Sequence, residues 1–189
     1  MTKRELQKGD NSIFSYQEFF DIILGYDDGK DNFTDIDFCV FYKKKDQSTG
    51  GVFSREYGRG LRSEGDLYSF PYIYLMGELR PKPSYQNEEI IRFANIHDME
   101  EVYLVAIDYN AAVGNRKVSF PTSIIIETLC TKPVVSFEFS KCENDRGCVY
   151  LMAVLREYTE ESISITNKAA LLELSEAVNI IPGFNTIIQ

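Results

Sequence analysis

Short segments rich in β-branched and aromatic residues follow one another along most of this chain, and this pattern limits its fold more than any other feature. Gly, Pro, Asn and Asp separate most of the segments, as they commonly do between strands. The segments span residues 19–26, 35–42, 71–76, 89–96, 101–109, 120–129, 133–140, 148–158 and 162–166. Because almost no helical periodicity lies between them, the sequence predicts an all-β fold, mainly an antiparallel β-sandwich, or else a barrel.

One segment, "NKAALLELSEAV" at 167–178, departs from the strand pattern. Its apolar residues at 170, 171, 174, 177 and 178 recur at the spacing of an amphipathic helix. Asn167 is a residue type that caps helix starts, and the "NIIPGF" that follows is typical of a helix end. The sequence therefore predicts a short C-terminal helix packed on or beside the sandwich, or a short helix followed by a mobile tail.

Length and composition indicate a single domain over residues 1–189. The chain is 44% hydrophobic and 26% charged, which is ordinary for a globular protein large enough to bury a proper core. No low-complexity linker or internal repeat divides it.

The charge balance narrows the classes of partner. With 29 acidic and 20 basic residues the formal net charge is −9, which argues against nucleic acid or an anionic membrane as the main partner. A cation, a basic protein or solubility alone would each suit this charge. No stretch has the pattern of a signal peptide or the length of a membrane span, so we expect a cytoplasmic protein.

The cysteines fit a reducing compartment. Cys39 and Cys130 lie in apolar runs and are expected to be buried thiols. Cys142 and Cys148 bracket "ENDRG", so a hairpin could bring them together, but a stable disulfide is not favoured in the cytosol. Because His97 is the only histidine and no CxxC pair exists, a zinc site is disfavoured.

Asp35 and Asp37 raise a question of charge. In a strand, residues i and i+2 lie on one face about 7 Å apart, so two carboxylates there repel unless something neutralises them. Further acids cluster at 26–37, 77–79 and 87–89, and loops at one end of a sandwich converge. A divalent cation such as calcium would supply the counter-charge through carboxylate and carbonyl oxygens. No EF-hand spacing is present, and a solvated face or a partner such as Lys30 is the alternative.

Several short motifs occur in a recognisable order. "LQKGDN" (6–11), "IILGYD" (22–27) and "DIDF" (35–38) are followed by "GEL" (77–79) and "NEE" (87–89). This order resembles the tellurium-resistance TerD-like family, whose chains carry "LGWD", "D-L-D", "GDN" and "DDE" motifs at similar spacing. The resemblance extends to the last hairpin and the terminal helix, and covers about 6–181 as one TerD-like domain.

The resemblance implies a calcium-binding β-sandwich with no established catalytic activity. The family consists of cytoplasmic bacterial proteins tied to resistance against tellurite and other stress. Transferred residue by residue, the metal ligands would be Asp35, Asp37, Glu78, Asn87, Glu88 and Glu89, with a weaker claim for Asp27.

The chain also departs from the family pattern. The stretch "RPKPSYQ" (80–86) stands where the family has a loop rich in Gly and Asp, and its prolines stiffen the backbone. Leu79 replaces an amide ligand and Asn87 replaces a carboxylate, which weakens the attraction for a hard cation. One weak calcium site, or none, is therefore expected. If the ion has been lost, Arg80 or Lys82 would be the counter-charge.

Three functions remain open. The leading one is a non-enzymatic, calcium-responsive stress module whose partners are other proteins of the same resistance system. The second is a metal-independent protein-interaction module that uses the 80–86 loop and Tyr85. The third is an enzyme built on the D-x-D or on His97 beside Asp98. We disfavour catalysis because the chain has no βαβ alternation and no GxSxG nucleophile motif.

Overall fold

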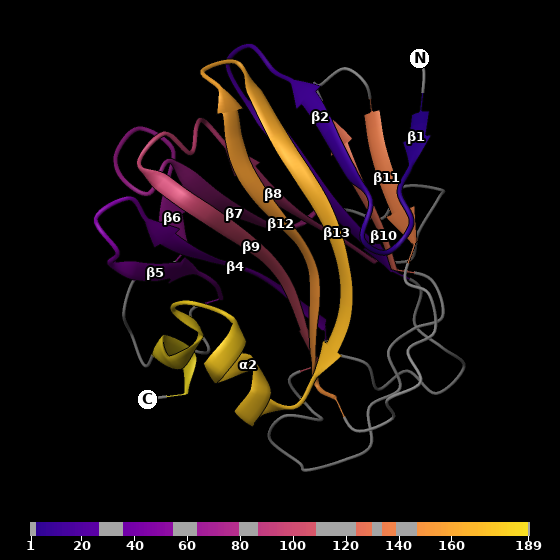
Figure 1. Cartoon of the computed structure of the whole chain (residues 1–189), viewed down its shortest axis with the longest axis vertical. Coiled ribbons are helices and arrows are strands. Elements are labelled where there is room, and N and C mark those ends of the chain that lie inside the picture. The colour runs from indigo at the N-terminus through magenta and orange to yellow at the C-terminus, as the bar shows by residue number, and fades with distance from the viewer. Residues whose placement is uncertain are drawn as a thin grey trace.

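Two β-sheets packed face to face form the protein (Figure 1), as seen in a computed structural model of the chain. The structure describes residues 3–26, 36–54, 64–79, 87–108, 124–129, 134–138 and 147–188. All of the described strand pairs are antiparallel except the one between β1 and β11. The predicted all-β sandwich is confirmed.

The first sheet, sheet A, has seven described strands. In spatial order they are β1 (Lys3–Glu5), β11 (Val134–Glu138), β10 (Ile124–Leu129), β3 (Phe20–Tyr26), β8 (Asn87–Phe93), β7 (Ile73–Leu79) and β6 (Gly65–Asp66).

The second sheet, sheet B, has six described strands. In spatial order they are β2 (Asn11–Ser15), β13 (Ser162–Leu172), β12 (Val149–Thr159), β9 (Met99–Asp108), β4 (Ile36–Lys44) and β5 (Thr49–Val52).

Alternate residues of both sheets fill the core between them. On β4, Ile36, Phe38 and Val40 belong to this core, because every second side chain of a strand points to the same face. From sheet A, Phe20 and Phe93 are cross-strand partners whose rings stack with centroids 4.7 Å apart. Such aromatic pairs contribute to sheet stability beyond the area they bury.

The outer face of sheet B is also buried, under the C-terminal segment. Cys39 and Phe41 of β4 form a second cluster with Ala177, Ile181 and Phe184, and the rings of Phe41 and Phe184 lie 5.2 Å apart. Because β4 is covered on both faces, its sequence is a nearly continuous apolar run.

The predicted helix at 167–178 is wrong in its first half. Strand β13 continues to Leu172, and the helix α2 spans only Leu174–Ile180. Residues 170–172 pair with β12, and this pairing outweighs their helical spacing. Asn167 does not cap a helix; it is buried in β13, and its side-chain amide donates to the carbonyl of Leu6 at 3.1 Å.

The residues after α2 pack against sheet B. A short 3-10 helix, η1 (Phe184–Ile187), follows Gly183 and contacts β5. Gly183 has φ +86°, and a side chain on it would place a Cβ 2.6 Å from the carbonyl oxygen of Gly50. Glycine is therefore required here for both its conformation and the close approach. This region lies at the lower left of Figure 1.

Candidate functional site

The strand registers bring the predicted acidic segments to one end of the sandwich. Asp37 at the start of β4 pairs with Ile107 near the end of β9, where Asp108 follows. Glu88 and Glu89 lie at the start of β8. We call the four acids Asp37, Glu88, Glu89 and Asp108 the acidic end.

A hydrogen bond between the sheets fixes this end. The N–H of Phe38 in sheet B donates to Oε2 of Glu89 in sheet A at 2.5 Å. The β4–β5 register includes no partner before Val40, so the Phe38 N–H lies beyond the paired part of β5. A carboxylate that accepts a backbone N–H makes a strong, charge-assisted hydrogen bond. Glu89 therefore closes an open strand edge with a charged group.

The charges of Asp37 and Glu89 both raise the pKa of the Cys39 thiol. Burial raises the pKa of Cys39 well above its ordinary value, and the nearby charges of Asp37 and then Glu89 raise it further. A thiolate there would be both desolvated and repelled. Cys39 is thus a buried thiol, as predicted, and the negative charges of both carboxylates disfavour its thiolate form.

The other two carboxylates of the acidic end are more deeply buried. Glu88 is 2% exposed and Asp108 is 6% exposed. Glu88 follows the alternation of β8 onto the face opposite to Glu89, which shares its face with Ile91. Burial and then the charge of Asp108 raise the pKa of Cys148. Cys148 is a free thiol, and Cys142 lies outside the described residues.

The structure therefore gathers only part of the predicted ligand set. Asp37 and Glu89 both lie at this end of the sandwich, but alternation places Asp37 on the face of β4 that carries Cys39 and Phe41. Glu89 lies on the core side of β8, as Ile91 does, and Glu88 lies on the opposite face. In the strand registers, Glu78 is opposite Glu89 and Asn87 is opposite Tyr26. Asp27 and Asp35 lie outside the described residues, as do Lys30, Arg80, Lys82, Tyr85 and Cys130.

The donor chemistry at the acidic end suits calcium, but the described donors are few. Calcium takes six to eight oxygens, including carboxylates and water. Within the described ranges, no group of three or more His, Cys, Asp or Glu side chains is placed to hold a metal ion. Asp37 and Glu89 would supply two carboxylates, and one oxygen of Glu89 already accepts a hydrogen bond. An ion held by these two alone would bind weakly.

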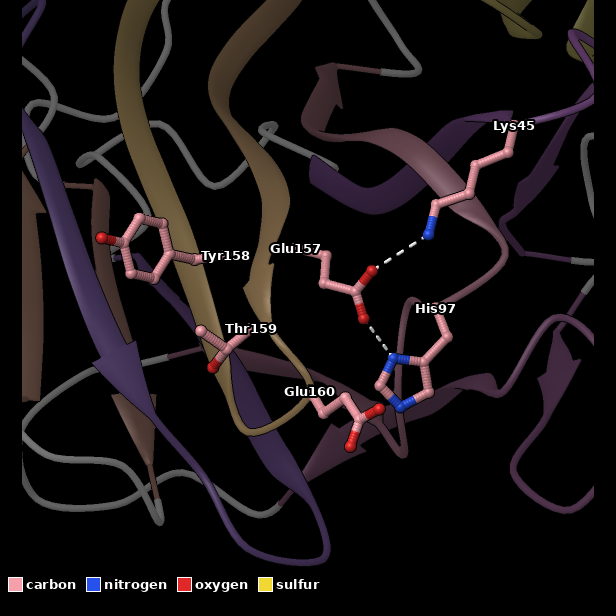
Figure 2. Close-up of a pocket in the computed structure, with 6 residues that line it drawn as sticks. All are labelled: Lys45, His97, Glu157, Tyr158, Thr159 and Glu160. Atoms are coloured by element: carbon pink, nitrogen blue, oxygen red, sulfur yellow. Dashed lines mark hydrogen bonds and ion pairs between the residues drawn. The ribbon is translucent and has the colours of Figure 1, made fainter.

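A second charged site lies at the opposite end of the sandwich. It is a hollow of about 410 Å³ lined by Lys45, His97, Glu157, Tyr158, Thr159 and Glu160 (Figure 2). Nδ1 of His97 contacts Oε1 of Glu157, and Nζ of Lys45 lies 3.0 Å from Oε2 of the same carboxylate. Glu157 thus contacts both Lys45, from the β4–β5 turn, and His97, from the connection between β8 and β9.

Several acids and bases form ion pairs at this second end, which we call the paired end. Lys43 contacts Glu100 at 2.8 Å, Lys44 contacts Asp46 at 3.0 Å, and Arg156 contacts Glu101. Burial would raise the pKa of Glu157, but its hydrogen bonds from His97 and Lys45 outweigh burial and lower it. The carboxylates here are stabilised in their charged form.

Sequence reasoning considered His97 together with its neighbour Asp98 and missed its partner in the fold. Glu157 is 60 residues further along the chain, so no local spacing connects the two side chains. Only the packing of β12 beside β9 brings them together.

Neither a protein-family model nor a curated protein matches this chain. The TerD-like resemblance therefore stays an expectation that rests on the sequence motifs. In the described part of the chain, no helix is long and apolar enough to cross a membrane.

Proposed function

We propose that this chain is a non-enzymatic binding module that takes up calcium at the acidic end, in the manner of a cytoplasmic TerD-like stress-resistance protein. The observation that supports this function is the Phe38–Glu89 hydrogen bond. It brings Glu89 of β8 to the backbone of Phe38, the residue that follows Asp37, although 52 positions separate Asp37 from Glu89 in the sequence.

Asp37 and Glu89 are the described residues that would hold the ion. Asp27, Asp35, Glu78 and Asn87 are the further candidates from the family motifs, whereas Glu88, also a motif residue, lies on the face of β8 opposite to Glu89. A bound cation would neutralise negative charge at the strand ends and join β4 of one sheet to β8 of the other. In this proposal the ion-loaded end is recognised by other proteins of a stress-resistance system.

The test is the melting temperature of the full chain in EDTA and then in calcium, magnesium or manganese. A ligand that binds only the folded protein adds about 2.7 kcal/mol at a hundredfold excess over its Kd. For a domain of this size, that corresponds to a rise of roughly 5–10 °C. We expect the rise with calcium and a smaller one with magnesium, because magnesium dehydrates reluctantly and demands a stricter geometry.

Charge-removing variants locate the ion. Asp37→Asn and Glu89→Gln should each reduce the calcium-dependent rise, and Glu89→Gln keeps an oxygen that can accept the Phe38 N–H. Glu18→Gln is the matched control, because Glu18 is exposed and precedes β3 at the paired end. A calcium effect that survives both Asp37→Asn and Glu89→Gln would place the ion elsewhere, and no effect in the native chain would overturn calcium binding.

A metal-independent interaction module is the second candidate, and one surface favours it. The turn between β6 and β7 and the strand after it expose aromatic side chains: Tyr68 is 90% exposed, Phe70 39% and Tyr74 38%. Exposed aromatic residues are enriched at protein interfaces. If no metal raises the melting temperature, co-purification of partners with native chain but not with a Tyr68→Ser/Tyr74→Ser variant would favour this function.

A further inference from the structure

We propose that two copies of this chain join along strand β2, so that sheet B of one copy continues into sheet B of the other. This association uses backbone groups and a neutral strip of side chains. It goes beyond calcium binding and does not involve the proposed calcium ligands.

Every second residue of β2 turns its backbone groups away from sheet B. The N–H of Tyr16, just after β2, donates to the carbonyl of Glu161 at 3.1 Å, so the residues with even numbers face β13. Because the direction alternates along an antiparallel strand, Asn11, Ile13 and Ser15 face outward. In the described part of the chain, the backbone groups of these three residues have no hydrogen-bond partner. Such a row of donors and acceptors pairs readily with another strand.

The other border strands of the two sheets are protected in ways that β2 is not. All three residues of β1 are charged, and β6 has only two residues. The C-terminal segment contacts β5, where Gly183 closely approaches the backbone of Gly50. Charge, shortness and cover are the usual means of keeping a strand edge from pairing. Strand β2 has five residues with no charge and no proline, so among the described border strands it is the one open to a partner.

The neutrality of this border favours a second copy as the partner. Residues 11–15 and the paired residues 162–166 read "NSIFS" and "SISIT", whereas the whole chain has a net charge of −9. Two copies with this charge repel each other over most of their surface. Contact between them therefore costs least where the charge is absent, as it is along β2 and the neighbouring part of β13.

The sequence of β2 is complementary to itself in one register. When Ile13 lies on a two-fold axis, Asn11 of each copy is opposite Ser15 of the other. The outward-facing residues then form three hydrogen-bonded pairs, and each pair exchanges two N–H···O bonds. The side chain of Ile13 is 40% exposed in one copy and packs against its equivalent across the axis. The same patch is thus used by both copies, as in a closed dimer.

The charges that flank β2 suit the same register. Lys8 and Glu18 are both exposed and each lies five positions from Ile13. The two-fold axis therefore brings Lys8 of one copy toward Glu18 of the other. Asp10 lies at the same end as Lys8, where its carboxylate accepts the N–H of Gln7 at 3.0 Å. Opposite charges across an interface fix its register.

The first test is the molar mass of the full chain in EDTA, measured by sedimentation equilibrium over a range of concentrations. We expect a mass that rises toward twice the 21.7 kDa of one chain. Ile13→Lys places like charges on the axis and should raise the Kd of the dimer by about tenfold or more. Val178→Lys is the matched control, because Val178 is 39% exposed and lies on α2, across the molecule from β2 (Figure 1). A native chain that stays monomeric up to about 1 mM would overturn the proposal.

Two further variants test the strand pairing and its register. Ile13→Pro removes an N–H that faces outward, which an edge strand tolerates, so it should abolish the dimer and leave the chain folded. Lys8→Glu should weaken the dimer by roughly two- to fivefold, and the addition of Glu18→Lys should restore it. A dimer that persists in both Ile13→Lys and Ile13→Pro would place the interface elsewhere and overturn the proposal.

Amide hydrogen exchange reports on the edge itself. The N–H groups of Ile13 and Ser15 should be protected at high chain concentration and exchange rapidly on dilution. The N–H of Phe14 faces β13 and should be protected at both concentrations, which makes it an internal control. Protection of the Ile13 N–H that appears only when a different protein is added to a monomeric chain would assign the edge to a foreign strand. That result would overturn the dimer.

Discussion

The carboxylates at the two ends of the sandwich have different kinds of partner. At the paired end, Glu100, Glu101 and Glu157 each contact a base from another part of the chain. At the acidic end, Glu89 accepts a hydrogen bond from a backbone N–H. The strand ends that meet there, residues 36–38, 87–89 and 106–108, contain no Lys or Arg.

Strand β4 explains this difference. Asp37 lies at its start, while Lys43, Lys44 and Lys45 lie at its end or just beyond it. At about 3.3 Å per residue, six residues place Asp37 and Lys43 about 20 Å apart, well beyond the range of an ion pair. Asp37 and Lys43 are close in sequence but therefore lie at opposite ends of the sandwich. A strand separates charges that a helix turn would bring together.

The largest loss in the free energy of unfolding should follow from removing the carboxylate of Glu89, which lies between the sheets. Glu89→Ala leaves the Phe38 N–H without its acceptor, so the free energy of unfolding should fall by about 2–3 kcal/mol in urea denaturation. Glu100→Ala is the control at the paired end, where the carboxylate is exposed, and it should have a clearly smaller effect. If the two losses are equal, the ends do not differ in this respect.

A smaller effect is expected for the exposed ion pair of the hollow. Lys45→Gln should lower the free energy of unfolding by about 0.5 kcal/mol, because the Lys45 side chain is 59% exposed. The loss should disappear in about 1 M NaCl, where charges are screened within about 3 Å, while the loss in Glu89→Ala should persist. A Lys45 effect that resists salt would contradict this assignment.

The smallest effect concerns the β4–β5 turn. Hydrogen bonds from Ser48 and Lys44 lower the pKa of Asp46 to about 2. A carboxylate with a lowered pKa stabilises the fold above its ordinary pKa, and this contribution disappears as the pH falls through the lowered value. The stability difference between the native chain and Asp46→Asn should therefore shrink between about pH 4 and about pH 2. Thermal unfolding measures it, and a constant difference would show that Asp46 acts only through its shape.

The sequence was sufficient for the sandwich but not for the site. Residue type identified β4 and β9 as strands, because continuous runs of β-branched and aromatic residues are typical of strands that are buried on both faces. The same reasoning failed at 167–172, where helical spacing competed with a strand partner, β12, that only the tertiary fold supplies. The convergence of Asp37 and Glu89 could be expected from the motifs. Strand alternation predicts that Glu88 and Glu89 lie on opposite faces of β8. Neither the motifs nor the alternation predicts the contact between His97 and Glu157.

The pairing of the first strands with the last has a consequence for how the chain is made. Strand β2, at Asn11–Ser15, has β13 as its described neighbour, through residues 162–166. On the ribosome, β2 must therefore wait until most of the polypeptide has emerged. Long-range pairing of this kind slows folding and leaves strand edges open to wrong partners. The nascent chain, more than the finished protein, is where aggregation has to be avoided.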